Sequence, residues 1–100
     1  MPAGRPNVLL VVLDSVRARN CSLYGYRRGT TPFLKSLAGE ATVYTQARAP
    51  SNWSLPSHVS VFTGTDAHAH KVTTHDRLRP GTTVFDTLAD RGYRTGLFTE

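Results

Sequence analysis

The sequence has a single cysteine, Cys21, and lacks any long run of apolar residues. One cysteine excludes an internal disulfide and a multi-cysteine metal site, and it gives no sign of an oxidising compartment. The apolar run near the N-terminus covers residues 8–13 and ends at Asp14, so it is too short for a membrane span or a signal peptide. We therefore expect a cytoplasmic protein with no membrane partner.

Acidic residues are also few. The sequence has 7 Asp and Glu and 12 Lys and Arg, so its net charge is +5. Such a charge suggests nucleic acid when the basic residues are clustered. Here they are scattered, with no run longer than two, and no aromatic residues alternate with them to stack bases. We therefore expect no nucleic-acid partner, and the positive balance instead suits a small anionic substrate.

Apolar runs alternate with amphipathic stretches along the chain. Strands are predicted at residues 8–13, 42–45 and 93–98. Helices are predicted to begin at Pro32, just after Ser54, and after Thr82 or Thr83, while residues 66–80 are predicted as a surface loop. The β-branched residues after Ser54 would also suit a strand. The alternation indicates an α/β fold with a mostly parallel sheet and flanking helices.

The predicted first strand is apolar throughout, which is typical of a strand covered on both faces of a sheet. Too few further strands are predicted in 100 residues to cover it. We therefore expect residues 1–100 to be the N-terminal part of a larger, truncated domain. A small complete α/β domain is the alternative.

Asp14 directly follows this strand, at the carboxyl end where open α/β folds bind their ligands. Hard divalent cations such as Ca²⁺ or Mg²⁺ prefer carboxylate oxygens, so Asp14 is a candidate metal ligand. By itself an aspartate in this place is as often a turn or a helix cap.

Ser54 lies at a predicted helix start, where unpaired N–H groups and the helix dipole attract anions. A nucleophile there faces a sulfate or phosphate ester. Ser57 adds a hydroxyl for substrate binding, and His58 could donate a hydrogen bond to the ester oxygens. Taken alone, this pattern is more typical of a helix cap followed by an exposed histidine.

Three further histidines, His68, His70 and His75, lie close together in the predicted loop. Imidazoles two residues apart could reach one metal ion from an extended segment. Solvated loop histidines are the more ordinary outcome, and we expect no metal site here.

Several segments in order resemble the sulfatase family of the alkaline phosphatase superfamily. Residues 5–14 (RPNVLLVVLD) resemble the family's opening strand and metal-binding aspartate, and residues 31–38 (TPFLKSLA), after Tyr24 and Gly25, resemble its YG…TPNLDRLA stretch. Residues 54–64 (SLPSHVSVFTG) resemble the signature C/S-x-P-S-R-x-x-x-x-T-G, and residues 88–95 (LADRGYRT) resemble L-x-x-x-G-Y-x-T.

The resemblance implies an alkaline-phosphatase-like fold and a metal-assisted sulfate ester hydrolase. In that family, the residue matching Ser54 is oxidised to formylglycine, whose hydrate attacks sulfur while Ca²⁺ or Mg²⁺ holds the sulfate oxygens; Mn²⁺ is a further candidate. The resemblance thus implies Ser54 and His58 as catalytic residues, and Asp14 and Ser54 as metal ligands. It also implies that residues 1–100 alone are inactive, because the other ligands lie downstream.

Three positions depart from the family pattern. Ser15 stands where a second metal-binding aspartate is usual, His58 replaces the signature arginine, and Thr99 lies where many members carry a catalytic lysine segment. Two alternatives therefore stay open. One is a phosphate or phosphonate ester hydrolase or transferase of the same superfamily, and the other is a non-catalytic binding protein with a degenerate site.

Overall fold

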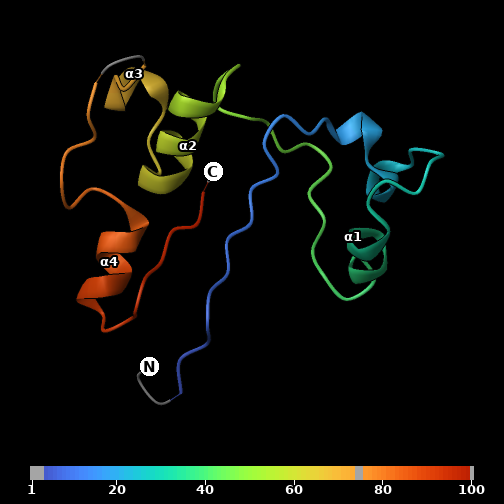
Figure 1. Ribbon diagram of the computed structural model, residues 1–100, viewed down its shortest axis with the longest axis horizontal. Helices are drawn as coiled ribbons and strands as arrows, with labels where there is room; N and C mark the ends of the chain where they lie inside the picture. Colours follow the sequence, from blue (N-terminus) through green and yellow to red (C-terminus); the bar gives the residue numbers. More distant parts are fainter. Residues whose placement is uncertain (1–3, 74–75, 100) are drawn as a thin grey trace. The chain divides into compact units, whose positions relative to one another are not determined.

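The computed structural model describes residues 4–73 and 76–99 (Figure 1). These form two compact units, of which the larger comprises Met1–Leu10 and Ala49–Glu100 and the smaller comprises Val11–Arg48. In the smaller unit lie η1 (Ala18–Asn20), η2 (Ser22–Tyr24) and α1 (Pro32–Leu37). In the larger unit lie α2 (Ser54–Thr63), α3 (Ala67–His70) and α4 (Val84–Asp90). No described helix has the length and apolar character that crossing a bilayer requires.

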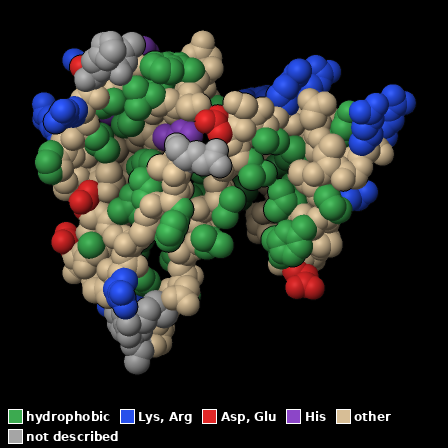
Figure 2. Space-filling model, viewed as in Figure 1, with side chains coloured by type: hydrophobic (Ala, Val, Ile, Leu, Met, Phe, Trp, Pro, Cys, Tyr) green, Lys and Arg blue, Asp and Glu red, His purple; other side chains and the backbone are tan. Residues whose placement is uncertain are grey.

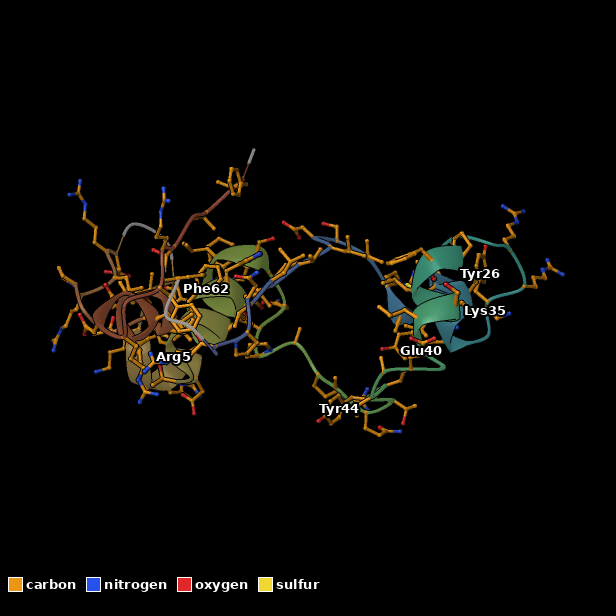
Figure 3. The ribbon with its side chains drawn as sticks, turned by 90° about the horizontal axis from the view of Figure 1, so that it is seen from below. Arg5, Tyr26, Lys35, Glu40, Tyr44 and Phe62 are labelled. Atoms are coloured by element: carbon orange, nitrogen blue, oxygen red, sulfur yellow. The ribbon has the colours of Figure 1, made fainter. Side chains whose placement is uncertain are left out.

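The smaller unit is held together by hydroxyl groups around η2. Ser22, which is 4% exposed, donates its backbone N–H to Thr30 Oγ1 at 3.1 Å, and Leu23 donates to Thr31 Oγ1 at 3.2 Å. The hydroxyl of Thr31 therefore bonds to η2 and does not cap α1, although Pro32 still begins that helix. Tyr44 lies on the segment after α1 (Figure 3), and its carbonyl accepts the Tyr24 hydroxyl at 3.3 Å.

The larger unit packs α3 and α4 against α2. Phe62, labelled in Figure 3, belongs to α2. Its ring meets that of Phe85 of α4 edge to face, with ring centroids 5.0 Å apart. Pro56 and Val59 are buried on α2, and Val72, 4% exposed, is buried beyond α3. This small core fixes the orientation of α2.

The predicted helices at Pro32, after Ser54 and after Thr83 are confirmed, the last ending just before Gly92. The prediction that residues 66–80 form only a loop is wrong, because α3 lies within them. Asp66 caps α3 by accepting the N–H groups of His68 and Ala69, which stabilises a single helical turn.

The predicted parallel sheet is not confirmed. The chain is irregular or bent at the three predicted strands, residues 8–13, 42–45 and 93–98. No strand is present among residues 4–73 and 76–99 (Figure 1). A strand exists only through hydrogen bonds to a neighbouring strand. The side chains of residues 8–13 are accordingly 47–86% exposed, and hydrophobic side chains reach the surface on much of the face in Figure 2.

α4 begins at a capping box. Thr83 Oγ1 accepts the Asp86 backbone N–H at 3.2 Å, and Asp86 Oδ2 accepts the Thr83 N–H at 2.9 Å. The hydroxyl and then the backbone N–H of Thr83 lower the pKa of Asp86 below its ordinary value of 3.8. The carboxylate form of Asp86 is therefore favoured by the folded helix start.

Replacing Thr83 with alanine should lower the stability of the complete protein by about 1 kcal/mol, because it removes the helix cap. The folded pKa of Asp86 is lowered, so its contribution is present above pH 3.8 and is lost as the pH falls through the lowered value. Thermal unfolding at neutral and acid pH measures both effects. Exposed Thr45, replaced with alanine, is the control, and an equal loss there or a loss independent of pH would contradict the prediction.

Candidate active site

Ser54 is the first residue of α2. The chain arrives extended at Trp53, with φ −148° and ψ 166°, and Pro56 lies in the first helical turn, where its missing N–H costs no hydrogen bond. Pro56 is less than 2% exposed, whereas Ser54 is exposed. The buried proline thus anchors the turn that presents Ser54 to solvent at the positive end of a ten-residue helix.

Ser57 and His58 lie in the same turn, and both bond to nearby backbone carbonyls. Ser57 Oγ donates to the carbonyl of Ser51 at 3.0 Å, and His58 Nδ1 lies 2.7 Å from the carbonyl of Ser54. The Ser57 hydroxyl proton therefore ties down the segment that leads into the helix. Ser57 keeps lone pairs to accept a hydrogen bond but has no second proton to donate to a substrate.

The contact from His58 Nδ1 also indicates which ring nitrogen carries a proton. A carbonyl oxygen only accepts hydrogen bonds, so Nδ1 carries a proton and a neutral ring has its lone pair at Nε2. Phe62 lies beside the ring, with centroids 5.9 Å apart, and restricts its movement. Ser54 and His58 are four residues apart and share one face of α2, so the structure brings these two predicted site residues together.

Asp14 lies in the smaller unit, at a tight turn. Its Oδ1 accepts the Ser15 hydroxyl at 3.3 Å, and both residues are exposed. Ser15 has a φ of 59°, in the left-handed region that a serine adopts only at a cost of order 1 kcal/mol. Strained turns of this kind occur often at functional sites. Asp14 and Ser54 belong to separate units.

The carboxylate of Asp14 and the hydroxyls of Ser15 and Ser54 are oxygen donors of the kind that Ca²⁺ and Mg²⁺ bind. Such ions take about six or more ligands, so these residues could supply only part of a set. In residues 4–73 and 76–99, no three His, Cys, Asp or Glu side chains are grouped closely enough to hold a metal ion.

The histidines of the predicted loop do not form a metal site within the described residues. Both nitrogens of His70 are engaged, since Nδ1 accepts the Val72 N–H at 3.0 Å and Nε2 lies 3.0 Å from Ser60 Oγ. A backbone N–H only donates, so Nε2 carries the proton and donates to Ser60. His70 thus joins α3 to α2. His68 is exposed in α3, and His75 lies outside the described residues.

Sequence reasoning missed the two carbonyl contacts that hold this turn. The spacing of His58 four residues after Ser54 was a signal for the first, because such pairs meet on a helix. The contact from Ser57 to Ser51 had no comparable signal, since it depends on the path of the preceding loop.

The sulfatase family model matches residues 6–100, and the chain belongs to this family of sulfuric ester hydrolases. An N-acetylgalactosamine-6-O-sulfatase of Bacteroides thetaiotaomicron is 29% identical over 93% of this chain and 20% of its own length. Human arylsulfatase A is 28% identical over 95% of this chain, and human arylsulfatase H is 29% identical over 94%.

The chain spans about a fifth of the length of these relatives, 19–20% in each case. No solved structure matches it. Family membership implies the alkaline-phosphatase-like fold, of which these residues are a part.

Proposed function

We propose that the chain is the N-terminal part of a catalytic domain that hydrolyses sulfate esters, with the nucleophile at Ser54. The observation that carries the proposal is the exposed position of Ser54 at the first residue of α2, inside the segment that resembles the family signature. The N–H groups of this first turn and the positive end of the helix dipole favour an anionic ester beside the Ser54 side chain.

The neighbouring side chains support this role. Ser57 keeps the entry to α2 in place through Ser51, so the N–H groups of the first turn keep one orientation. His58 lies four residues after Ser54 on the same face of α2, and we propose that its Nε2 accepts a hydrogen bond from the nucleophile or donates one to an ester oxygen. An arginine, which has no acceptor, would serve only the second purpose.

A divalent metal, when bound, would polarise the sulfate oxygens as a Lewis acid. The family generally uses such an ion, and Asp14 is the residue that we propose to hold it together with Ser54 and ligands from the rest of the protein. Ca²⁺ and Mg²⁺ are the first candidates and Mn²⁺ the next, because all three bind oxygen ligands.

We further propose that residues 8–13 and 93–98 become strands of a mostly parallel sheet in the complete protein. Both segments carry apolar residues, and residues 8–13 are largely exposed. Pairing would satisfy their backbone groups and cover their side chains. The partner that we propose is a small anionic ester in the cytoplasm, with no nucleic acid or membrane involved.

Turnover by the complete protein tests the proposed function. We expect hydrolysis of an aryl sulfate in the presence of Ca²⁺, Mg²⁺ or Mn²⁺, and slower hydrolysis of the matching aryl phosphate. Preference for the phosphate would indicate a phosphoryl-transfer enzyme of the same superfamily. Turnover of neither ester with any of the three metals would refute the hydrolase and leave a binding protein.

The mass of the peptide that contains Ser54, measured by mass spectrometry, tests whether the nucleophile is modified. Oxidation of the serine to an aldehyde removes two hydrogens and so lowers the mass by about two units. An unchanged mass in an active protein would show that the serine itself attacks the ester.

A further inference from the structure

A groove of about 490 Å³ lies in the larger unit between the C-terminal end of α2 and the segment that leads to α4. Its charged lining residues are Lys71, Asp76, Arg77 and Arg79. Among the described lining residues, basic side chains therefore outnumber carboxylates three to one. The groove lies at the opposite end of α2 from Ser54, at a distance of about 14 Å along the helix at 1.5 Å per residue.

The hydroxyl groups of the groove are already used inside the protein. Thr63 donates to the Val59 carbonyl at 2.7 Å and accepts from Thr65, and Thr82 donates to the Arg79 carbonyl at 2.6 Å. These hydroxyls have no proton left for a ligand. Recognition in the groove thus depends on charge.

The three cationic side chains are available for that purpose. Within residues 4–73 and 76–99, no hydrogen bond or ion pair engages the ammonium of Lys71 or the guanidinium groups of Arg77 and Arg79. All three residues are exposed. Guanidinium groups bind oxyanions through two parallel N–H bonds, whereas an ammonium acts as a point charge, so the set suits several sulfate or carboxylate groups on one chain.

The lining residues also favour one kind of polyanion over another. Among the described residues, the one aromatic ring in the lining is that of His70, whose two nitrogens are already engaged by Val72 and Ser60, and the apolar members are Ala69, Val72 and Leu78. Single-stranded nucleic acid gains much of its affinity from bases stacked on aromatic rings, and the described lining of the groove contains no Phe, Tyr or Trp. Its volume falls within the range of pockets that hold small molecules, so it suits a short length of a flexible, charged saccharide.

We propose that this groove is a second anion-binding site, which extends the proposed substrate from a small ester to a sulfated polysaccharide and holds that polysaccharide away from the ester that is cleaved at Ser54. The saccharide identity of the ligand rests on the proposed function, whereas the anion site itself rests on the groove. Binding of a remote part of the substrate in this way lowers KM and can assist the reaction at the cleaved ester.

The test uses the complete protein with heparin as the probe. A variant with Lys71→Asn, Arg77→Ser and Arg79→Ser removes the three cations, and asparagine is chosen because Lys71 has a φ of 57°, which asparagine tolerates. We expect the Kd for heparin to rise at least about tenfold and its dependence on salt to weaken. The ratio of KM for a sulfated polysaccharide to KM for a small aryl sulfate should rise as well.

The matched control is Arg27→Ser with Arg28→Ser, which removes exposed cations from the smaller unit. Heparin affinity that falls equally in the control, or that stays unchanged in a groove variant with an unaltered Tm, overturns the proposal. Single-stranded DNA bound as tightly as heparin and lost with the same three cations overturns the saccharide assignment. Turnover of the small aryl sulfate reports separately on the proposed function.

Discussion

Replacing Ser54 with alanine is expected to lower kcat/KM for an aryl sulfate by at least about a thousandfold in the complete protein. The side chain occupies the first position of α2, so its removal leaves the backbone N–H groups of the first turn in place. It takes away the proposed nucleophile, whether serine or the aldehyde made from it, and with it the proposed metal-ligand oxygen of Ser54. Steady-state kinetics with the aryl sulfate measure the effect. KM should change little in comparison with kcat, because the dipole of the helix still attracts the ester.

Ser36→Ala is the matched control, since Ser36 is an exposed helical serine of α1 whose hydroxyl donates to the Phe33 carbonyl at 2.7 Å. Its activity should stay within about twofold of the unaltered protein, as is usual for surface substitutions. Activity of the Ser54 variant close to that of the control would show that the nucleophile lies elsewhere.

Replacing Asp14 with asparagine is expected to reduce turnover at least about a hundredfold at a fixed, low metal concentration. The change keeps the size of the side chain and one oxygen that can accept the Ser15 hydroxyl, but it removes the negative charge that attracts a divalent cation. Part of the activity should return at high metal concentration. Kinetics over a metal titration, together with direct metal binding, measure both effects.

Asp90→Asn is the control for Asp14, because Asp90 is an exposed carboxylate at the last residue of α4. Its metal titration should match that of the unaltered protein. An Asp14 variant with the same metal dependence as the Asp90 variant would remove Asp14 from the metal site and leave it as a residue of the turn.

The helices could be predicted from the sequence because their signals are local. Pro32 and Thr83 each stand at a helix start, and Gly64, with a φ of 69°, ends α2 in the left-handed conformation that glycine adopts most readily. The short helix α3 was missed because a single turn has no hydrophobic period. Its stability comes from one capping aspartate, Asp66.

The strands could not be predicted in the same way, because a strand forms only by pairing with residues that are far apart in the chain. The apolar run at residues 8–13 predicts a buried strand, yet its side chains are at least 47% exposed here. A strand of this type needs neighbours on both edges and layers on both faces. The sequence pattern describes that environment, and residues 4–73 and 76–99 form no neighbouring strand that would supply it.

The same distinction between local and non-local features applies to the candidate site. The position of Ser54 at a helix start followed from Pro56 and was predicted correctly, because both residues belong to one turn. The contact between His58 Nδ1 and the Ser54 carbonyl and the strained φ of Ser15 depend on side-chain and backbone angles that no residue pattern encodes. The metal-binding role of Asp14 stays a prediction.

The burial of Pro56 has a consequence for the timing of any modification at Ser54. An oxidising enzyme that needs this segment as an extended peptide cannot obtain it once α2 has formed, because Pro56 is less than 2% exposed and Ser57 is bonded to Ser51. Opening the turn would expose the core around Val59 as well. Conversion of Ser54 by such an enzyme would thus have to precede the folding of α2, and a protein that folded first would keep its serine.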